Sequence, residues 1–368
     1  SNQKLNIMTK GFYTLRQEGN KIIATSTSSA ESITFKPEHA KYKKIASYLA
    51  DGKLLSVTAK GTMSGRKDYE GFYKQVKSTA EPVEVNLTKL DELSFNEDLF
   101  KPMPTGTPAD KWLSNDGGFM PGSNVMAAGA PGCGKTSVLC ELLYRVKEND
   151  PSKKVLFISA EMNQLDMARY LKRFPHWGQL PILFLSDYVD ANPQRVIEQT
   201  LDQGWDLVLT DSYTEVNDTV KEECGLTRGK TEKWFLDLMI SQNKGQNKLE
   251  KYTTFITILQ LSKGGTFVGS NKLKHMTTAM MHMDWKGEEN SSERYMEFSK
   301  NRLGQVGQKM FFSLEDGVEF DEIRYKRDLL NEEMIQEEKE KLKSEEAAFD
   351  KLFSSLPNEA ETEEAEVE

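Results

Sequence analysis

The chain has 368 residues, which is enough for about two domains, and 38% of the residues are hydrophobic. No apolar run reaches the ~18 residues that a membrane-spanning helix needs, and no secretory signal pattern opens the sequence. We therefore expect neither a membrane protein nor a secreted one. The three cysteines lack the C-x-x-C spacing of a zinc site or a disulfide framework, which fits a reducing cytoplasm.

The net charge of −9 is concentrated at one end of the chain. Residues 331–368 contain fourteen acidic residues and four lysines, whereas residues 1–330 contain 44 basic and 43 acidic residues. The body of the protein is therefore nearly neutral. Any binding to nucleic acid must depend on local basic segments rather than on the overall charge.

Residues 1–104 are expected to form a small α+β unit. Apolar and β-branched runs predict a hairpin around Gly19-Asn20, a third strand and a helix, at residues 12–15, 21–25, 32–35 and 39–49. No motif in this unit carries chemistry, which favours an assembly domain or a docking domain for a partner. Proline and glycine cluster at residues 102–108 and mark a boundary.

Residues 105–325 alternate between short buried strands and helices, which predicts an α/β fold with a parallel sheet flanked by helices. The expected strands are rich in β-branched residues and lie at 124–128, 155–158, 182–185, 207–209 and 254–259. Residues 326–368 are expected to form a charged helix followed by an acidic disordered tail. Apolar residues within this segment indicate either a peptide that docks on a partner or on the body of the protein, or a solvated tail.

A phosphate-binding loop follows the strand at 124–128. The pattern G-x-x-x-x-G-K-[ST] is matched by Gly129, Ala130, Pro131, Gly132, Cys133, Gly134, Lys135 and Thr136, and Ser137 continues into an apolar helix at 137–146. Glycines let backbone N–H groups surround a phosphate chain at the helix N-terminus. Lys135 is expected to reach the β- and γ-phosphates of ATP, and Thr136 to offer its hydroxyl to Mg²⁺.

Three polar residues at or near strand ends complete the expected site. Asp211 follows the strand 207–209, where a carboxylate holds the water shell of Mg²⁺. Glu161 follows the strand 155–158 and either polarises the attacking water or simply caps the next helix. Gln260 ends the strand 254–259 and either senses the γ-phosphate or is a satisfied strand-end amide.

The order of these motifs resembles that of RecA-superfamily ATPases of the RadA, KaiC and DnaB groups. The resemblance is carried by the loop at 129–136 and by the short motifs Thr105-Gly106, Asp116-Gly117-Gly118, Pro121-Gly122 and Asp211-Ser212. Residues 155–162 are similar to the strand that ends in the catalytic glutamate of those proteins, which implies that Glu161 activates water. Gln164-Leu165 and Arg169 resemble DnaB helicases.

Two further blocks resemble RadA. They are residues 261–276 and the sequence Lys300-Asn301-Arg302-Leu303-Gly304, which fits a K-N-R-x-G signature. The resemblance implies that Lys300 and Arg302 reach the γ-phosphate in a neighbouring subunit of a homo-oligomeric ring, which is expected to be a hexamer. A cation supplied in trans stabilises the transition state only when the neighbour is correctly placed.

The sequence also departs from RadA. The first hundred residues contain no cysteine for RadA's four-cysteine zinc module, and an acidic tail stands where RadA has a Lon-protease-like domain. Gln260 stands where RadA has a histidine and RecA has a glutamine. These differences leave open a phage-encoded relative, or a DnaB-like motor with another front domain.

In RecA-type motors, the segments after the Asp211 and Gln260 strands face DNA. The resemblance therefore implies DNA contacts from a loop at 262–275 and a loop at 213–233, through Lys263, Phe267, Lys272, Lys274, Arg228 and Lys230. The expected function is an ATP-dependent motor on single-stranded DNA in recombination, repair or replication. The alternatives are a replicative helicase of the DnaB type and a KaiC-like regulatory ATPase that drives protein assembly without DNA.

Overall fold

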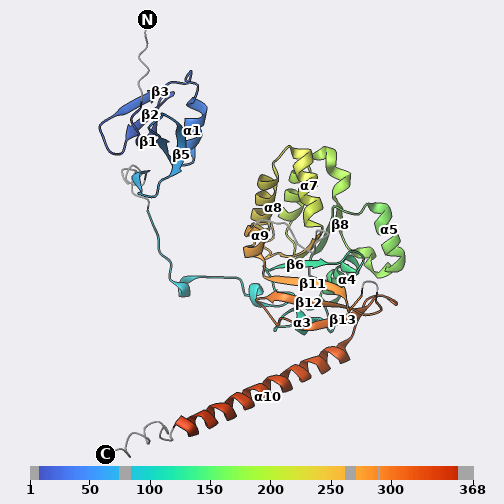
Figure 1. The fold of residues 1–368 in the computed structure, drawn as a ribbon. Helices are drawn as coiled ribbons and strands as arrows, with labels where there is room; N and C mark the ends of the chain where they lie inside the picture. Colours follow the sequence, from blue (N-terminus) through green and yellow to red (C-terminus); the bar gives the residue numbers. More distant parts are fainter. Residues whose placement is uncertain (1–7, 74–83, 262–270, 289–290, 355–368) are drawn as a thin grey trace, which may run out of the picture. The chain divides into compact units, whose positions relative to one another are not determined.

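The computed structural model describes residues 8–73, 84–261, 271–288 and 291–354 (Figure 1). The chain divides into two compact units, residues 1–93 and 94–368, and each contains a hydrophobic core. Within these described ranges, no helix is both long enough and apolar enough to cross a membrane.

The N-terminal unit is a five-stranded antiparallel sheet with one helix. The strand order is β3-β2-β1-β4-β5. The elements are β1 (Gly11–Glu18), β2 (Lys21–Ser26), β3 (Ser32–Phe35), α1 (Tyr42–Ala50), β4 (Lys53–Val57) and β5 (Met63–Lys67). The predicted hairpin, third strand and helix are confirmed. The helix begins later than residue 39 because turns occupy the preceding residues, where His39 Nδ1 accepts a hydrogen bond from the Lys41 backbone.

The segment around residues 102–108 packs within the second unit, after the division at residue 93. Met103 is buried and exchanges two backbone hydrogen bonds with Phe119. Gly118 permits this approach, since a Cβ atom there would lie 2.4 Å from the Met103 carbonyl oxygen. Nearby, the Asp110 carboxylate accepts hydrogen bonds from the backbone N–H groups of Thr105 and Gly106, which explains the Thr-Gly motif.

The second unit is built on a nine-stranded sheet in the order β14-β13-β12-β11-β6-β10-β9-β7-β8. The strands from β11 to β8 in this order are parallel, and β12, β13 and β14 are antiparallel. Their bounds are β6 (Asn124–Gly129), β7 (Val155–Ser159), β8 (Ile182–Phe184), β9 (Leu207–Asp211), β10 (Thr254–Leu259), β11 (Ala279–Trp285), β12 (Arg294–Asn301), β13 (Lys309–Ser313) and β14 (Glu319–Phe320).

Helices cover both faces of this sheet, so the predicted mixed α/β fold with a mostly parallel core sheet is confirmed. Successive residues of a strand point to opposite faces. On β9, Leu207 and Leu209 therefore join the core beside α4, whereas Val208 joins the core beside α7 and α8. The apolar strand runs found in the sequence reflect this burial on both sides.

The α-helices of the second unit are α3 (Asp110–Leu113), α4 (Lys135–Asn149), α5 (Gln164–Arg173), α6 (Pro193–Asp202), α7 (Tyr213–Cys224), α8 (Arg228–Asn243), α9 (Asn271–Met276) and α10 (Glu322–Ser354). Short 3₁₀ helices are η2 (Glu97–Phe100), η3 (Pro175–Gln179) and η4 (Leu185–Ala191), and η1 (Leu90–Glu92) lies before the division. Helices α3, α4 and α5 contribute to one core cluster, and α6, α7, α8 and α9 to the other.

The prediction of a loop at residues 213–233 is wrong, because helices α7 and α8 occupy this segment. Ser212 caps the start of α7 by accepting a hydrogen bond from the Glu215 backbone. Gly225 ends α7 in the left-handed conformation, and Thr227 caps the start of α8. Serine and threonine N-caps and a left-handed glycine are ordinary signals for the start and end of helices. They predict helix here, although the charged residues of the segment had suggested a loop.

Helix α10 occupies most of the segment for which the sequence predicts a charged helix. Its first turns pack on β13, where Tyr325 is buried. Every residue from Leu330 to Ser354 is exposed, including Leu342 and Phe349. Among the described residues of this helix, tertiary packing is therefore confined to its start.

Trp112 packs α3 against the antiparallel strands of the sheet. Its replacement tests how much this packing contributes to stability. The indole is fully buried, stacks on Phe298 with ring centroids 4.2 Å apart, and donates to the Gln308 carbonyl oxygen at 2.8 Å. We expect Trp112→Ala to lower the free energy of unfolding by about 3–5 kcal/mol, as measured by urea denaturation. Leu330→Ala, at an exposed site, should change it by less than about 0.5 kcal/mol. Equal losses in both variants would contradict this assignment.

Candidate functional site

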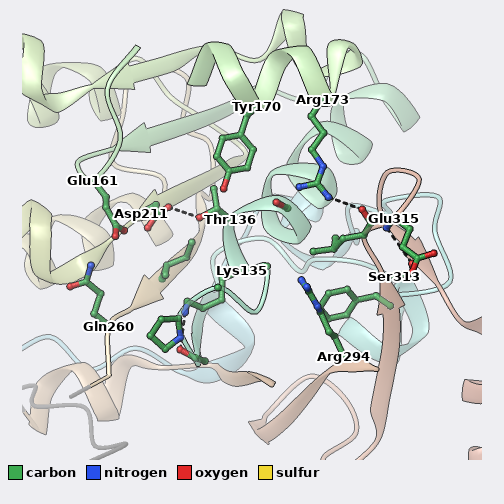
Figure 2. A pocket seen from close by; sticks show the side chains of 18 of the residues that line it. Lys135, Thr136, Glu161, Tyr170, Arg173, Asp211, Gln260, Arg294, Ser313 and Glu315 are labelled. Atoms are coloured by element: carbon green, nitrogen blue, oxygen red, sulfur yellow. Dashed lines mark hydrogen bonds between the residues drawn. The ribbon is translucent and has the colours of Figure 1, made fainter. Parts of the chain in front are cut away.

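The candidate site lies at the carboxyl ends of neighbouring parallel strands. Asp211 pairs in register with Ser159 of β7 and with Ile258 of β10. Glu161 and Gln260 each follow their paired residue by two positions, so the sheet brings all three polar side chains to one edge (Figure 2). Parallel α/β sheets bind ligands at this edge.

The loop between β6 and α4 is held by close backbone packing. Gly132 and Gly134 have φ values of +78° and +99°, which side chains rarely tolerate. A Cβ atom at Gly134 would also lie 2.5 Å from the Leu314 side chain. Lys135 Nζ donates to the carbonyl oxygens of Gly129 and Ala130 at 2.7 and 3.2 Å. The loop therefore curls around the start of α4 and keeps its lysine at the pocket.

Thr136 and Asp211 are in direct contact, with Thr136 Oγ1 donating to Asp211 Oδ2 at 2.8 Å. Asp211 is 2% exposed. Burial above all, together with the neighbouring Glu161 carboxylate, raises the pKa of Asp211 to about 7, while the hydrogen bond from Thr136 acts in the opposite direction. A buried carboxylate with so strong a penalty on its charge is suited to a bound cation.

A cavity of about 850 Å³ joins these groups. Its lining includes the predicted residues Gly129, Pro131, Gly132, Gly134, Lys135, Thr136, Ser137, Glu161, Asp211 and Gln260. Ala130 and Cys133 belong to the loop but do not line the cavity. The Cys133 side chain is buried instead, and its Sγ lies 3.6 Å from the Met283 carbonyl oxygen.

The opposite wall of the cavity contains residues that the sequence did not reveal. Tyr170 and Arg173 extend from α5, and Arg294 and Glu315 come from the antiparallel strands and the turn after them (Figure 2). Arg173 Nη2 donates to the Leu314 carbonyl oxygen at 2.6 Å and bridges the two sides. These segments are far apart in the sequence and meet only in the folded protein. No local motif or spacing could therefore have identified them.

Lys300 and Arg302 are absent from the cavity lining and lie toward the other end of the sheet. Lys300 pairs with Met280 of β11, whose neighbour on β6 is Met126, near the start of that strand. Partial burial, Arg302 and Lys274 lower the pKa of Lys300, which indicates a cluster of three cations. Lys300 Nζ also contacts the Lys274 carbonyl oxygen at 3.4 Å.

The residues expected to contact DNA are distributed over several segments. Lys263 and Phe267 lie outside the described residues. Lys274 is exposed on α9, whereas Lys272 is ion-paired with Asp237 of α8. Arg228 and Lys230 are exposed in the first turn of α8 rather than in a loop. Of the candidates within the described residues, Lys274 is the one with a recorded contact to the Lys300–Arg302 cluster.

A phosphate-binding loop follows β6, and the buried carboxylate of Asp211 ends β9, which is separated from β6 by β10. Together they define the core of a P-loop nucleoside triphosphatase. No protein-family model matches the chain. The chain is 25% identical over 217 residues to the DNA repair protein RadA of Mycobacterium tuberculosis, covering 59% of this chain and 42% of RadA. It is 24% identical over 236 residues to RadA of Streptococcus pneumoniae, covering 64% and 49%.

The chain is distantly related to RadA over the region that carries the phosphate-binding loop, and it resembles the RecA-superfamily ATPases. It spans less than half the length of the RadA proteins that it matches. Among solved structures, it is similar to a KaiC-like protein from Pyrococcus horikoshii, with a TM-score of 0.46, 16% identity, and 60% and 98% of the two chains covered. It is also similar to the RadB recombinase, with a TM-score of 0.41, 19% identity, and 59% and 98% covered.

The raised pKa of Asp211 predicts a pH-dependent effect of Asp211→Asn in protein free of nucleotide and Mg²⁺. The carboxylate prefers its neutral form in the folded state, so its ionisation destabilises the fold progressively from about pH 4 to about pH 7. Asparagine keeps an acceptor for Thr136 without the charge. We expect the variant to be more stable than the wild type at pH 8, by up to about 4 kcal/mol, and equal to it near pH 4.

Differential scanning calorimetry at several pH values measures this difference. Asp316→Asn, which neutralises an exposed carboxylate, is the matched control and should leave the melting temperature nearly unchanged. A pH-independent effect of Asp211→Asn would show that burial does not penalise the charge.

Proposed function

We propose that this protein is an ATP-dependent DNA motor of the RecA, RadA and DnaB type. It binds single-stranded DNA in the cytoplasm and hydrolyses ATP between the subunits of a homo-oligomeric ring, with six subunits as the expected number. The observation that supports the proposal most is the gathering of Lys135, Thr136, Asp211, Glu161 and Gln260 around one cavity. The expected process is recombination, repair or replication of DNA.

The residues of the cavity fit ATP with Mg²⁺. Within the described ranges, no cluster of three His, Cys, Asp or Glu residues could hold a metal on its own. Thr136 and Asp211 instead suit a Mg²⁺ ion that arrives with the nucleotide. Thr136 and the phosphate oxygens would bind the ion directly, and Asp211 would hold the water molecules around it. Bound Mg²⁺ would neutralise charge on the β- and γ-phosphates.

The roles of the side chains follow from the chemistry of phosphoryl transfer. Lys135 exchanges the loop carbonyls for phosphate oxygens, and Glu161 orients the attacking water and takes its proton. Gln260, which directly follows β10, contacts the γ-phosphate. The segment after Gln260 would then change its conformation according to whether the γ-phosphate is bound. Lys300 and Arg302 act on the pocket of the neighbouring subunit, because strand register separates them from the pocket of their own chain.

A KaiC-like ATPase that drives protein assembly without DNA is the second candidate. It is favoured by the ion pair between Lys272 and Asp237, which neutralises one of the cations expected at the DNA. In this case the acidic tail or the N-terminal unit would dock on a protein partner. A replicative helicase of the DnaB type shares the chemistry of the first proposal and differs in unwinding a duplex.

ATP turnover with and without single-stranded DNA tests the motor proposal. We expect DNA to stimulate turnover several-fold and Lys135→Ala to abolish it, since the lysine contacts the transferred phosphate. Lys147→Ala, near the end of the same helix, is the matched control and should turn over ATP normally. DNA-independent turnover, with no DNA binding at low salt, would overturn the motor and favour the assembly switch.

Mixing two inactive variants tests the action of Arg302 in trans. Lys135→Ala and Arg302→Ala are each expected to be inactive when measured alone. In a randomly mixed head-to-tail ring, about a quarter of the interfaces would pair an intact loop with an intact arginine. The mixture should therefore regain ATPase activity. Failure to regain any activity, although the subunits exchange, would contradict a role in trans.

A further inference from the structure

The N-terminal unit carries a positive charge that the overall composition conceals. Its described residues, 8–73, contain eleven lysines and arginines and six acidic residues, in a chain whose net charge is −9. Four of the six carboxylates have partners within the unit, and Glu18 and Asp51 form exposed ion pairs with Arg16 and Lys53. Glu31 accepts hydrogen bonds from Thr9 and Tyr13, and Asp68 accepts from the backbone N–H groups of residues 72 and 73. The unit as a whole therefore attracts a polyanion.

The two faces of the N-terminal sheet differ in what covers them. Helix α1 packs on one face of the sheet (Figure 1). On this face, Ile45 joins the core with Tyr13 and Leu55. The contact is close on β5, since a Cβ atom at Gly65 would lie 2.6 Å from the Tyr48 ring. Residues that alternate with these buried positions must point to the opposite face.

The opposite face presents an aromatic ring and two arginines. The register places Phe12 and Arg16 on β1, and Arg66 on β5, all between residues that point toward α1. Phe12 is 39% exposed, and the Arg66 guanidinium lies 5.8 Å from its ring centroid. The side chain of Arg16 is 62% exposed and contacts Glu18 at 3.5 Å, an exposed ion pair of little energy.

Hydroxyl groups and two aliphatic side chains share this face, where Arg16 pairs with Ile23 of β2 and Arg66 pairs with the buried Leu54 of β4. Thr14 lies between Phe12 and Arg16 on β1 and pairs with Thr25 of β2, and Ser56 pairs with Ser64 between β4 and β5. Arginine and hydroxyl side chains are common donors to phosphate oxygens. An exposed aromatic ring beside a guanidinium plane offers a surface on which bases stack, which an acidic peptide would not require.

We propose that this face of the N-terminal sheet binds single-stranded DNA. Phe12 stacks on a base, and Arg16 and Arg66 contact phosphates on either side of it. The surface is separate from the ATPase core, to which the proposed function assigns its DNA contacts. A strand held there would remain attached to the protein while the core releases and rebinds DNA.

Binding of a fluorescent oligothymidine to the full chain, followed by anisotropy, tests the proposal. We expect Arg16→Glu with Arg66→Glu to lower the affinity at least about tenfold and to reduce the salt dependence by about two phosphate contacts. Lys43→Glu with Lys44→Glu makes the same charge change on exposed positions of α1 and should have a much smaller effect. Phe12→Ala should also weaken binding about tenfold, since it removes the stacking surface.

Equal losses in the two double variants would overturn the proposal, because bulk charge alone would then explain them. Photocross-linking with an iodouracil-substituted strand gives a second measurement, and we expect adducts at Phe12. ATP turnover without DNA and the melting temperature should match those of the wild type in every variant. If Arg16→Glu with Arg66→Glu binds DNA normally, only this inference fails, whereas absence of DNA binding by the wild type would also remove the proposed motor function.

Discussion

The hydrogen bond from Thr136 to Asp211 connects the first turn of α4 to the end of β9, and the site is organised around this contact. It forms because β6 and β9 both flank β10 and end at the same edge of the sheet. The burial of Asp211 follows from that position, and so does its raised pKa. Ionisation of Asp211 is therefore unfavourable in the free protein, and a cation bound beside the carboxylate would offset that cost.

A buried network behind the pocket supports the wall opposite the loop. Glu141, five residues after Thr136 on α4, accepts hydrogen bonds from Arg145, His176 and Trp177. These bonds fix η3 against α4, and the preceding helix α5 carries the pocket residues Tyr170 and Arg173. The helix that presents the phosphate-binding loop therefore also determines where the second wall stands.

The sequence predicted five of the six parallel strands and the phosphate-binding side of the pocket because both have local signals. Each of these five strands is a short apolar run, and Lys135 and Thr136 belong to a contiguous motif. The sequence missed the sixth parallel strand, β11, in which buried residues alternate with less buried ones. It did not predict β5, whose glycine and charged residues hide the alternation, or the pocket residues Arg173 and Arg294, which only the folded sheet brings near the loop. The ion pair of Lys272 was equally invisible, because its partner Asp237 lies on another helix.

The separation of Lys300 from the pocket has a kinetic consequence. Its partner Met280 on β11 is level with Met126 of β6, and the three residues from there to Gly129, where the loop begins, span about 10 Å. If completion of each site requires the adjacent subunit, an isolated chain contains two halves of different active sites. Turnover per subunit would then fall on dilution, in the way that a second-order process does, whereas a self-sufficient subunit would keep a constant rate. The concentration of the protein in the cell would accordingly act as a switch on its own ATP consumption.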